Sequence, residues 1–417
     1  MKHKKSESKK EETKVDSNCI FSKEDVNLGH QPEFDYLKTL GVICMALIHV
    51  YIHSNEGYLF YYVDHIVNVL TGGALQMLMG IGMKYSSKND SKRYLSRGFL
   101  FLTMGQYLNL IRNCIPYLIA WKATGNKKFI ARALCILQTD ILSFAGFACI
   151  FMALLKKMKI SDKGILIIGC IMNFVAWPLF KIMKQPDSYL LKQLLGYFVL
   201  TNAESHFPLF SYFIFLAFGN WIADYYKKMK NKDKFYNRIL IFCFPIAVIY
   251  QYLRVNYNIP ILTEYGSYEH YNLNPFPDAI YRLMANIVIL AFYYKLDKLL
   301  GKTPYIISHC AKNLNQYYLI GFTFTMHFIV YLRVTRGDKY PSQFQYTDLF
   351  SFFLLFSSYY LIELNDKYIH FAIFTLKNPI RNIIFAVIWI MTVVSVIYIY
   401  PKVDEYTNVW NNYLYEV

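Results

Sequence analysis

Apolar runs of about 20 residues, separated by short charged segments, recur along most of this chain. Runs of that length match the hydrocarbon thickness of a bilayer, about 30 Å. Hydrophobic residues make up 55% of the 417 residues and charged residues only 17%. Repeated apolar runs at that composition are untypical of a soluble domain. The sequence therefore predicts an all-α fold, a polytopic membrane helix bundle.

Eleven runs are long enough to span, and the short run 189–200, which looks interfacial or re-entrant, sets a range of ten to twelve. The eleven runs are 36–54, 66–84, 98–119, 134–155, 164–183, 207–226, 237–254, 279–296, 313–332, 347–364 and 381–400. Together they predict one membrane domain over 33–400. A flexible basic tail at 1–32 and a short C-terminal tail at 401–417 flank it.

The distribution of basic residues predicts the orientation in the membrane. Loops 84–97, 156–163 and 227–238 are rich in Lys and Arg, whereas loops 54–65 and 255–278 contain neither. Because cytoplasmic loops retain positive charge, we expect a multi-pass plasma-membrane protein with a cytoplasmic N-terminus. The same clusters explain the net charge of +16 without a nucleic-acid partner. Four basic residues strain the rule by falling outside: Lys122, Lys127, Lys128 and Arg132.

The first predicted helix carries polar residues within an apolar run. On a helical wheel Asp35, Lys38, His49 and His53 share an arc of about 60°, and Lys38 lies about 16 Å from His49 along the axis. Polar groups in a membrane are costly, so one shared face indicates a polar cavity inside the bundle. A simpler alternative remains for Asp35, which could cap the helix and pair with Lys38.

These residues resemble the first-helix signature of the transmembrane acyltransferases, which include the acyltransferase-three enzymes and the heparan-alpha-glucosaminide N-acetyltransferase branch. That signature is Leu-Asp-x-x-Arg-Gly, then an apolar run ending in His. Here the stretch is FDYLKTLG, with Lys38 at the Arg position and His49 as the closing His. Further stretches resemble the family in the same order across roughly 33–330: ALQMLMGIGMKYSS, KRYLSRGFLFLTMGQYLNLIRN, CILQTDILSFAGF, HFPLFSYFIFLAFG and KNLNQYYLIGF.

Two departures concern the histidines of this family. The His that often ends the late helix of the acyltransferase-three enzymes is Gly321 here. In the heparan branch the catalytic His lies beyond the first helix, where this chain has His53 and His65 nearby.

The resemblance implies an acyl-CoA-dependent O- or N-acyltransferase. It would move an acetyl or other short acyl group from cytoplasmic acyl-CoA to a hydroxyl or amine of an extracytoplasmic glycan. Acetyl-CoA would be the acyl-donor cosubstrate, and no sequence motif implies a metal. The chain gives no indication of its oligomeric state.

The resemblance and the helix face together predict three groups of site residues. The candidate catalytic residues are His49, His53 and Asp35. The candidate contacts to acyl-CoA are Lys38, Arg93, Arg97, Gln138 and Asp140. The candidate contacts to the carbohydrate acceptor are Glu264, Glu269 and His270.

Each of these groups has a structural alternative. The two arginines could be ordinary membrane anchors, Asp140 a helix cap, and the outer aromatic segment an interfacial belt. A rival function is a transporter or flippase of a lipid-linked sugar or small solute. Internal repeats and paired broken helices would favour it, and the sequence reveals neither. A noncatalytic membrane interaction protein would leave the polar face unexplained.

Overall fold

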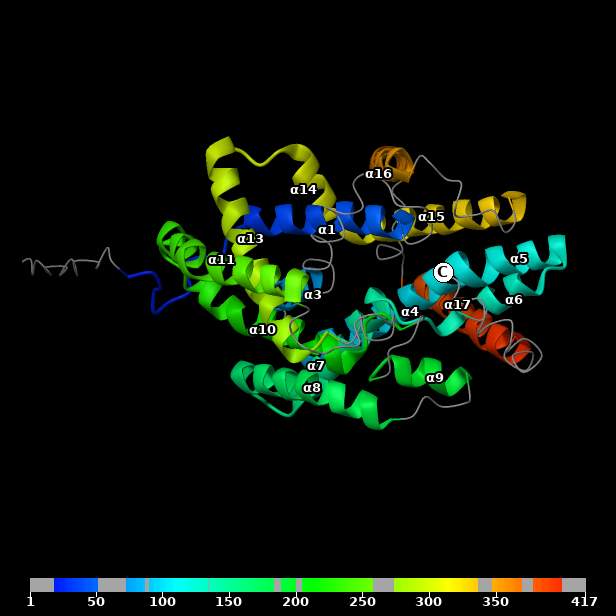
Figure 1. Cartoon of the computed structure of the whole chain (residues 1–417), viewed down its shortest axis with the longest axis horizontal. Helices are drawn as coiled ribbons and strands as arrows, with labels where there is room; N and C mark the ends of the chain where they lie inside the picture. The colour runs from blue at the N-terminus through cyan, green and yellow to red at the C-terminus, as the bar shows by residue number, and fades with distance from the viewer. Residues whose placement is uncertain are drawn as a thin grey trace, which may run out of the picture.

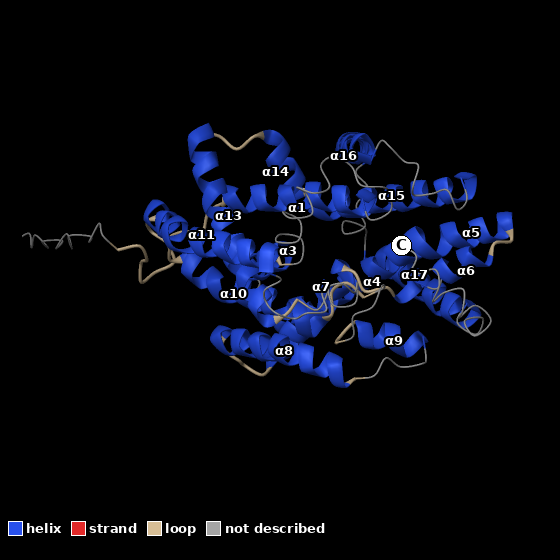
Figure 2. Cartoon of the chain, viewed as in Figure 1, coloured by secondary structure: helices blue, strands red, loops and turns tan. Residues whose placement is uncertain are grey.

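The computed structural model describes residues 19–51, 73–86, 90–133, 135–183, 189–199, 205–257, 274–336, 347–369 and 378–399. Over these residues the chain is helical and has no β-strand, only two isolated β-bridges (Figure 2). The predicted all-α class is therefore confirmed for the described part.

Each predicted run overlaps a helix (Figure 1). The long helices are α1 (Pro32–Tyr51), α3 (Ala74–Tyr85), α4 (Ser91–Asn109), α5 (Ile115–Thr124), α7 (Ile141–Lys157), α8 (Asp162–Ile182), α10 (Leu209–Lys227), α11 (Lys232–Tyr257), α13 (Phe276–Leu300), α15 (Leu314–Arg336), α16 (Thr347–Leu364) and α17 (Asn378–Ile399). The short helix α9 (Tyr189–Gly196) falls within the predicted short run 189–200. Two further short helices were not predicted as runs of their own: α6 (Lys127–Ala133) and α14 (Tyr305–Lys312).

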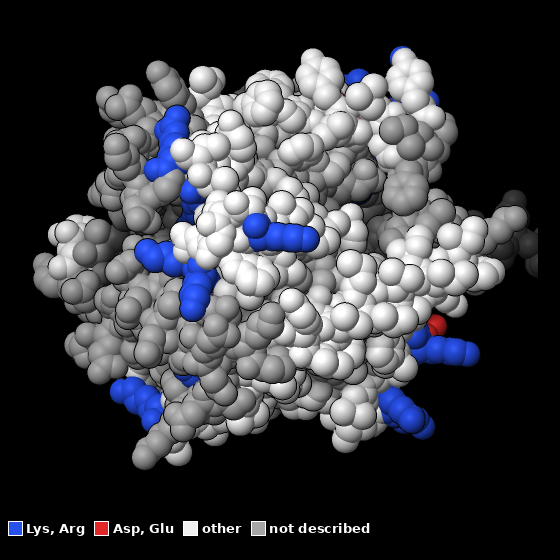
Figure 3. Space-filling view, turned by 90° about the vertical axis from the view of Figure 1, so that its right-hand side faces the viewer, with Lys and Arg blue, Asp and Glu red and all other residues white. Residues whose placement is uncertain are grey.

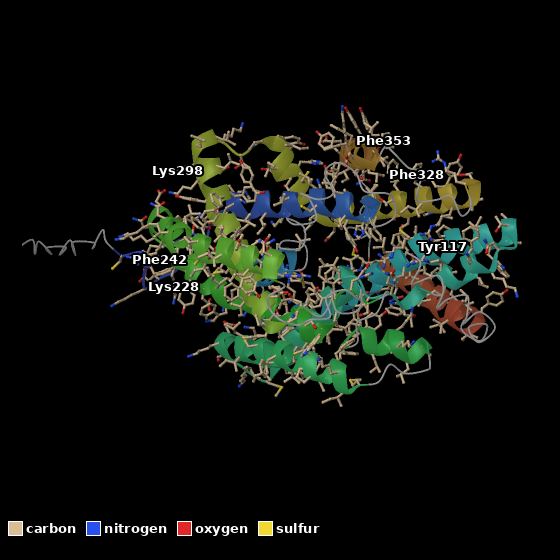
Figure 4. All side chains as sticks on the ribbon, in the orientation of Figure 1. Tyr117, Lys228, Phe242, Lys298, Phe328 and Phe353 are labelled. Carbon is tan, nitrogen blue, oxygen red and sulfur yellow. The ribbon has the colours of Figure 1, made fainter. Side chains whose placement is uncertain are left out.

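Five described helices are long and apolar enough to cross a membrane: Asp162–Ile182, Lys232–Leu253, Phe276–Leu300, Leu314–Arg336 and Pro379–Ile399. Large apolar side chains on the outer surface agree with this, and Figure 4 labels Phe242 and Phe353, which are 66% and 62% exposed. The structure thus supports a multi-pass membrane protein. The number of eleven crossings stays a prediction.

Ion pairs join the three loops that the sequence places on one side of the membrane. Lys84 contacts both Asp162 and Asp224, and Lys156 also contacts Asp162. The segments following α3, α7 and α10 therefore lie together at one end of the molecule. The opposite end, formed in part by α5 and α6, is also basic, as Figure 3 shows. Charge alone therefore does not decide which end is cytoplasmic.

Residues 19–31, expected in a flexible tail, instead pack on the turn between α10 and α11. Main-chain nitrogens of Ser22 and Asn27 donate to the carbonyls of Lys228 and Lys227, each at 2.7 Å. Phe21 stacks edge-on against Tyr225 and Phe235. The flexible part of the predicted tail therefore does not extend through these residues.

Helices α3 and α10 approach so closely that two glycines are required. A Cβ at Gly80 would overlap the carbonyl oxygen of Leu216, and a Cβ at Gly219 would overlap that of Met77. This contact lies in the main apolar core, which includes Met77, Leu216 and Phe213.

The predicted run 134–155 is not one helix. Its first part joins α6 to a short 3₁₀ turn, Cys135–Leu137, and α7 begins only after Asp140. The short run 189–200 contains α9, which is followed by a turn at 197–199, and the described residues 205–208 before α10 are also non-helical.

The two interruptions touch each other. Thr139 and Ser205 form a parallel β-bridge, and the main-chain nitrogen of His206 donates to the carbonyl of Thr139 at 3.2 Å. Non-helical backbone inside a membrane protein persists only where its polar groups are satisfied within the protein or by a polar cavity. Among the described residues, the stretch before α7 and the stretch before α10 therefore pair with each other through their main chains, a contact that the sequence does not reveal.

Candidate functional site

Arg112 lies at the centre of a buried polar cluster and is only 1% exposed. It belongs to a π-helical turn, Leu110–Cys114, that joins α4 to α5. Its Nη2 donates to Asn109 Oδ1 at 2.7 Å and to Gln138 Oε1 at 3.0 Å, and its Nη1 lies 3.5 Å from Asp140 Oδ2. A buried cation requires such partners, and π-turns within helices are frequent at functional sites.

The contacts of Gln138 assign the tautomer of a neighbouring histidine. Its Oε1 accepts from Arg112 and, at 2.9 Å, from Asn113 Nδ2. Its Nε2 lies 3.2 Å from His206 Nε2 and must be the donor, because the amide has its only hydrogens there. His206 therefore accepts at Nε2 and carries its proton on Nδ1.

Asp140 joins the cluster to the start of α7. Its Oδ1 accepts from the main-chain nitrogens of Leu142 and Ser143, each at 3.0 Å, which is an N-cap. Its Oδ2 accepts from the hydroxyl of Tyr318 at 3.2 Å and faces Arg112. The helix-cap alternative for Asp140 is therefore realised, and the same side chain also belongs to the polar cluster.

His49 reaches this cluster from α1. Its ring packs edge-on against Phe322 with centroids 3.9 Å apart, and the Arg112 guanidinium lies 4.6 Å from the centroid of the same ring. Arg112 and His206 are both close enough to interact electrostatically with His49. The structure thus brings three predicted residues together, His49, Gln138 and Asp140.

An internal cavity of about 10 Å³ adjoins His49. Its other lining residues come from α1, α15 and α16 and include Tyr317, Gly321, Phe322, Thr325 and Ser358. A volume of this size is about the minimum for one water molecule.

Asp35 and Lys38 lie away from His49, nearer the start of α1. Asp35 Oδ1 lies 3.3 Å from Lys38 Nζ, and Asp35 Oδ2 lies 3.0 Å from His30 Nε2. Lys38 lines an open cavity of about 300 Å³ together with His30, Phe34 and Tyr85. The pairing alternative for Asp35 is therefore realised, and within the described part of the chain no hydrogen bond or ion pair joins its carboxylate to His49.

The remaining predicted residues fall elsewhere. Arg93 and Arg97 lie in the first turns of α4, and no hydrogen bond or ion pair among the described residues connects either guanidinium with Lys38. His53, His65, Glu264, Glu269 and His270 lie outside the described residues.

Sequence reasoning missed Arg112, Asn113, His206 and Tyr318 as site residues. One signal for the first two was the pair of polar residues within the apolar stretch LNLIRNCIPYLI. An ionisable residue inside a membrane run is by default a functional candidate. His206 directly precedes the FPLF motif, but nothing in that motif shows where its side chain lies.

The cluster offers imidazole groups for proton transfer, a buried positive charge beside them and a phenol, away from bulk water. Base catalysis and electrostatic stabilisation of a developing anion use such groups. Among the described residues no three His, Cys, Asp or Glu side chains are placed to hold a metal ion. Comparison with protein-family models, with curated proteins and with solved structures finds no match for this chain.

Proposed function

We propose that this chain is a membrane acyltransferase. It moves an acetyl or other short acyl group from cytoplasmic acyl-CoA to a hydroxyl or amine of an extracytoplasmic glycan. One observation carries the proposal: α1 places Lys38 at an open cavity of about 300 Å³ and His49 at the buried polar cluster. The two residues are about 16 Å apart along the helix. A donor with an anionic head and a long arm matches that separation.

The open cavity suits the head of such a donor. Lys38 is 31% exposed at its side chain, so its ammonium can leave Asp35 and contact a phosphate by a charge-assisted hydrogen bond. Phe34, Leu78 and Tyr85 provide apolar and aromatic surface for the rest of the head group.

The buried cluster suits the transfer step. An unprotonated His49 accepts the proton of the acceptor hydroxyl or amine while the acceptor attacks the thioester carbonyl. Alternatively, the imidazole first takes the acyl group itself. The charge of Arg112 stabilises the developing oxyanion in either route. The products are the acylated glycan and the CoA thiolate, which is then protonated to the thiol, while His49 gives up the proton that it accepted.

A purified protein in lipid nanodiscs tests this proposal with radiolabelled acetyl-CoA and a panel of glycans. We expect acetyl-CoA to raise the melting temperature and label to appear on an acceptor. His49→Ala should still bind acetyl-CoA but lose transfer by about 10² or more. His327→Ala is the matched control, because His327 is exposed on α15 and, among the described residues, its ring bonds to Thr323 of its own helix. If the wild-type protein neither binds acetyl-CoA nor transfers its acetyl group, the acyltransferase proposal is refuted.

The main-chain pairing of the stretches before α7 and α10 favours a second candidate, a transporter or flippase of a lipid-linked sugar or small solute. Transporters commonly build substrate sites where discontinuous helices meet, and here the two stretches meet at Thr139 and Ser205. Sealed vesicles separate the two functions. Movement of an unmodified sugar without acetyl-CoA supports the transporter, whereas acetylation that requires acetyl-CoA supports the enzyme.

A further inference from the structure

A second group of titratable side chains connects α14, α15 and α16. His309 is 5% exposed, and its Nδ1 lies 3.1 Å from the hydroxyl of Tyr317. Its Nε2 lies 3.3 Å from Glu363 Oε1, which also accepts from the hydroxyl of Tyr305 at 2.7 Å. The side chain of Glu363 is 35% exposed. The group thus leads from the protein interior to the surface.

The imidazole of His309 and the carboxylate of Glu363 lie close together, but they are not aligned for a hydrogen bond. Their atoms are within ion-pair distance, yet His309 Nε2 lacks the geometry of a hydrogen bond. A small rotation of the partly exposed Glu363 would align the two. Such a contact is suited to intermittent proton transfer rather than to a rigid structural bond.

Tyr317 connects this group to the cavity beside His49. Both residues line that cavity, together with Thr325 and Ser358. Gly321 leaves the cavity open, because a Cβ there would lie 3.7 Å from Ser358 Oγ and would fill part of it. The lining is mostly apolar, but His49, Tyr317, Thr325 and Ser358 add polar groups to it, and the volume of about 10 Å³ is about the minimum for one water molecule. Such a water would join His49 to Tyr317.

Helix α14, which carries His309, is held against α1 by a hydrogen bond. Thr39 Oγ1 on α1 donates to the carbonyl of Ile307 on α14 at 3.0 Å. His309 is two residues beyond Ile307. The helix that carries His49 therefore also holds the segment that carries His309.

We propose that Tyr317, His309 and Glu363 conduct a proton between His49 and the aqueous phase. This inference rests on the proposed acyl transfer and adds to it a route for the proton through a closed bundle. The path ends at Glu363, at the close of α16, which the predicted orientation places on the cytoplasmic side.

Bonds and protons balance in the proposed acyl transfer. His49 takes the proton of the acceptor hydroxyl when the oxygen–acyl bond forms and the acyl–sulfur bond breaks. The proton passes through the cavity water to Tyr317, whose own proton moves to His309 Nδ1. His309 releases its Nε2 proton to Glu363 and then to solvent. The CoA thiolate leaves with the sulfur electron pair and is protonated by water on the cytoplasmic side.

His309→Gln in the full-length protein tests the path, because glutamine can bond to Tyr317 but does not shuttle a proton. We expect acetyl transfer to show a kcat at least about tenfold lower, with KM for acetyl-CoA unchanged. Added imidazole at millimolar concentration should restore much of that loss. Tyr317→Phe, which keeps the ring and removes the hydroxyl, should lower kcat similarly.

The matched control is His327→Gln, which should leave kcat at the wild-type value. Melting temperatures of all variants separate a folding defect from a kinetic one. A wild-type kcat in both His309→Gln and Tyr317→Phe would overturn the path, as would a loss in His309→Gln that imidazole does not restore. Failure of the proposed function has a different signature, namely no acetyl transfer by the wild-type protein itself.

Discussion

Gly321 on α15 and His49 on α1 line the same internal cavity. The position of Gly321 is the one at which the resembled acyltransferase-three enzymes often carry a histidine. The missing side chain leaves His49 as the histidine of this cavity within the described residues, and it leaves space for a water or a small acyl group. Under the proposed function, the proton-handling role therefore falls to the first helix rather than the late one.

Lys38 provides a prediction about donor binding. Lys38→Met should weaken acetyl-CoA binding by about 1.5–3 kcal/mol, because a charge-assisted contact to phosphate is lost. Lys38→Arg should retain most of the affinity, since the charge is kept. Titration of the purified protein with acetyl-CoA by calorimetry measures both. Lys92→Met, at an exposed position of α4, is the control, and equal affinities in all four proteins would leave Lys38 as only the partner of Asp35.

Arg112 provides a prediction about stability. Arg112→Met leaves Asp140 and the oxygens of Asn109 and Gln138 without their cation, so the protein should lose about 3–5 kcal/mol of folding free energy. Unfolding in mixed micelles of increasing denaturing-detergent fraction measures the change. Arg93→Met, on the preceding helix α4, should change little, because its side chain is partly exposed. Similar stabilities of the two variants would contradict the cluster.

The contact between α3 and α10 gives a third prediction. Gly80→Ala forces a methyl group against the main chain of α10, and we expect a loss of about 1–3 kcal/mol or more from overpacking. Gly82→Ala lies two residues further along α3, where a Cβ meets nothing within 4 Å. Thermal melting should therefore separate the two alanine variants, and coincident melting curves would show that the helices do not meet at Gly80.

Cysteine labelling tests the predicted orientation. In a cysteine-free background, Lys92→Cys should be protected from an impermeant thiol reagent added to intact cells, because its loop is assigned to the cytoplasm. Asn126→Cys, at the exposed turn between α5 and α6, should be labelled. The reverse pattern would invert the molecule, and labelling at both sites would place them on one side.

Apolar periodicity and run length were sufficient to find the long helices. Every predicted run overlaps a helix, because an apolar segment in a membrane satisfies its backbone only by forming one. The face shared by Lys38 and His49 stays a prediction, which rests only on a rotation of 100° per residue. Run length, periodicity and helical rotation depend only on residues that are near one another in the chain, so a single sequence is enough to predict them.

The broken helices and the buried arginine depend on distant partners. The run from 134 looks continuous, and only its QTD triplet, with Asp140 as a possible cap, hinted at a break. What stabilises the break is the pairing of Thr139 with Ser205, far along the chain. In the same way, Arg112 is tolerated because Gln138 and Asp140 lie opposite it. No local pattern encodes such a pairing.

Docking of residues 19–31 on the α10–α11 turn has a consequence for biosynthesis. Glu33 is 1% exposed and pairs with Lys232 at 2.8 Å, a partner 199 positions later in the chain. A ribosome that has made only the first half of the protein leaves this carboxylate without its cation. Leu28, His30 and Gln31 form one wall of the Lys38 cavity, so that wall is completed only after α11 begins to emerge. A nascent or truncated chain would therefore present an incomplete Lys38 cavity, and under the proposed function acyl-CoA capture would wait until most of the bundle has been inserted.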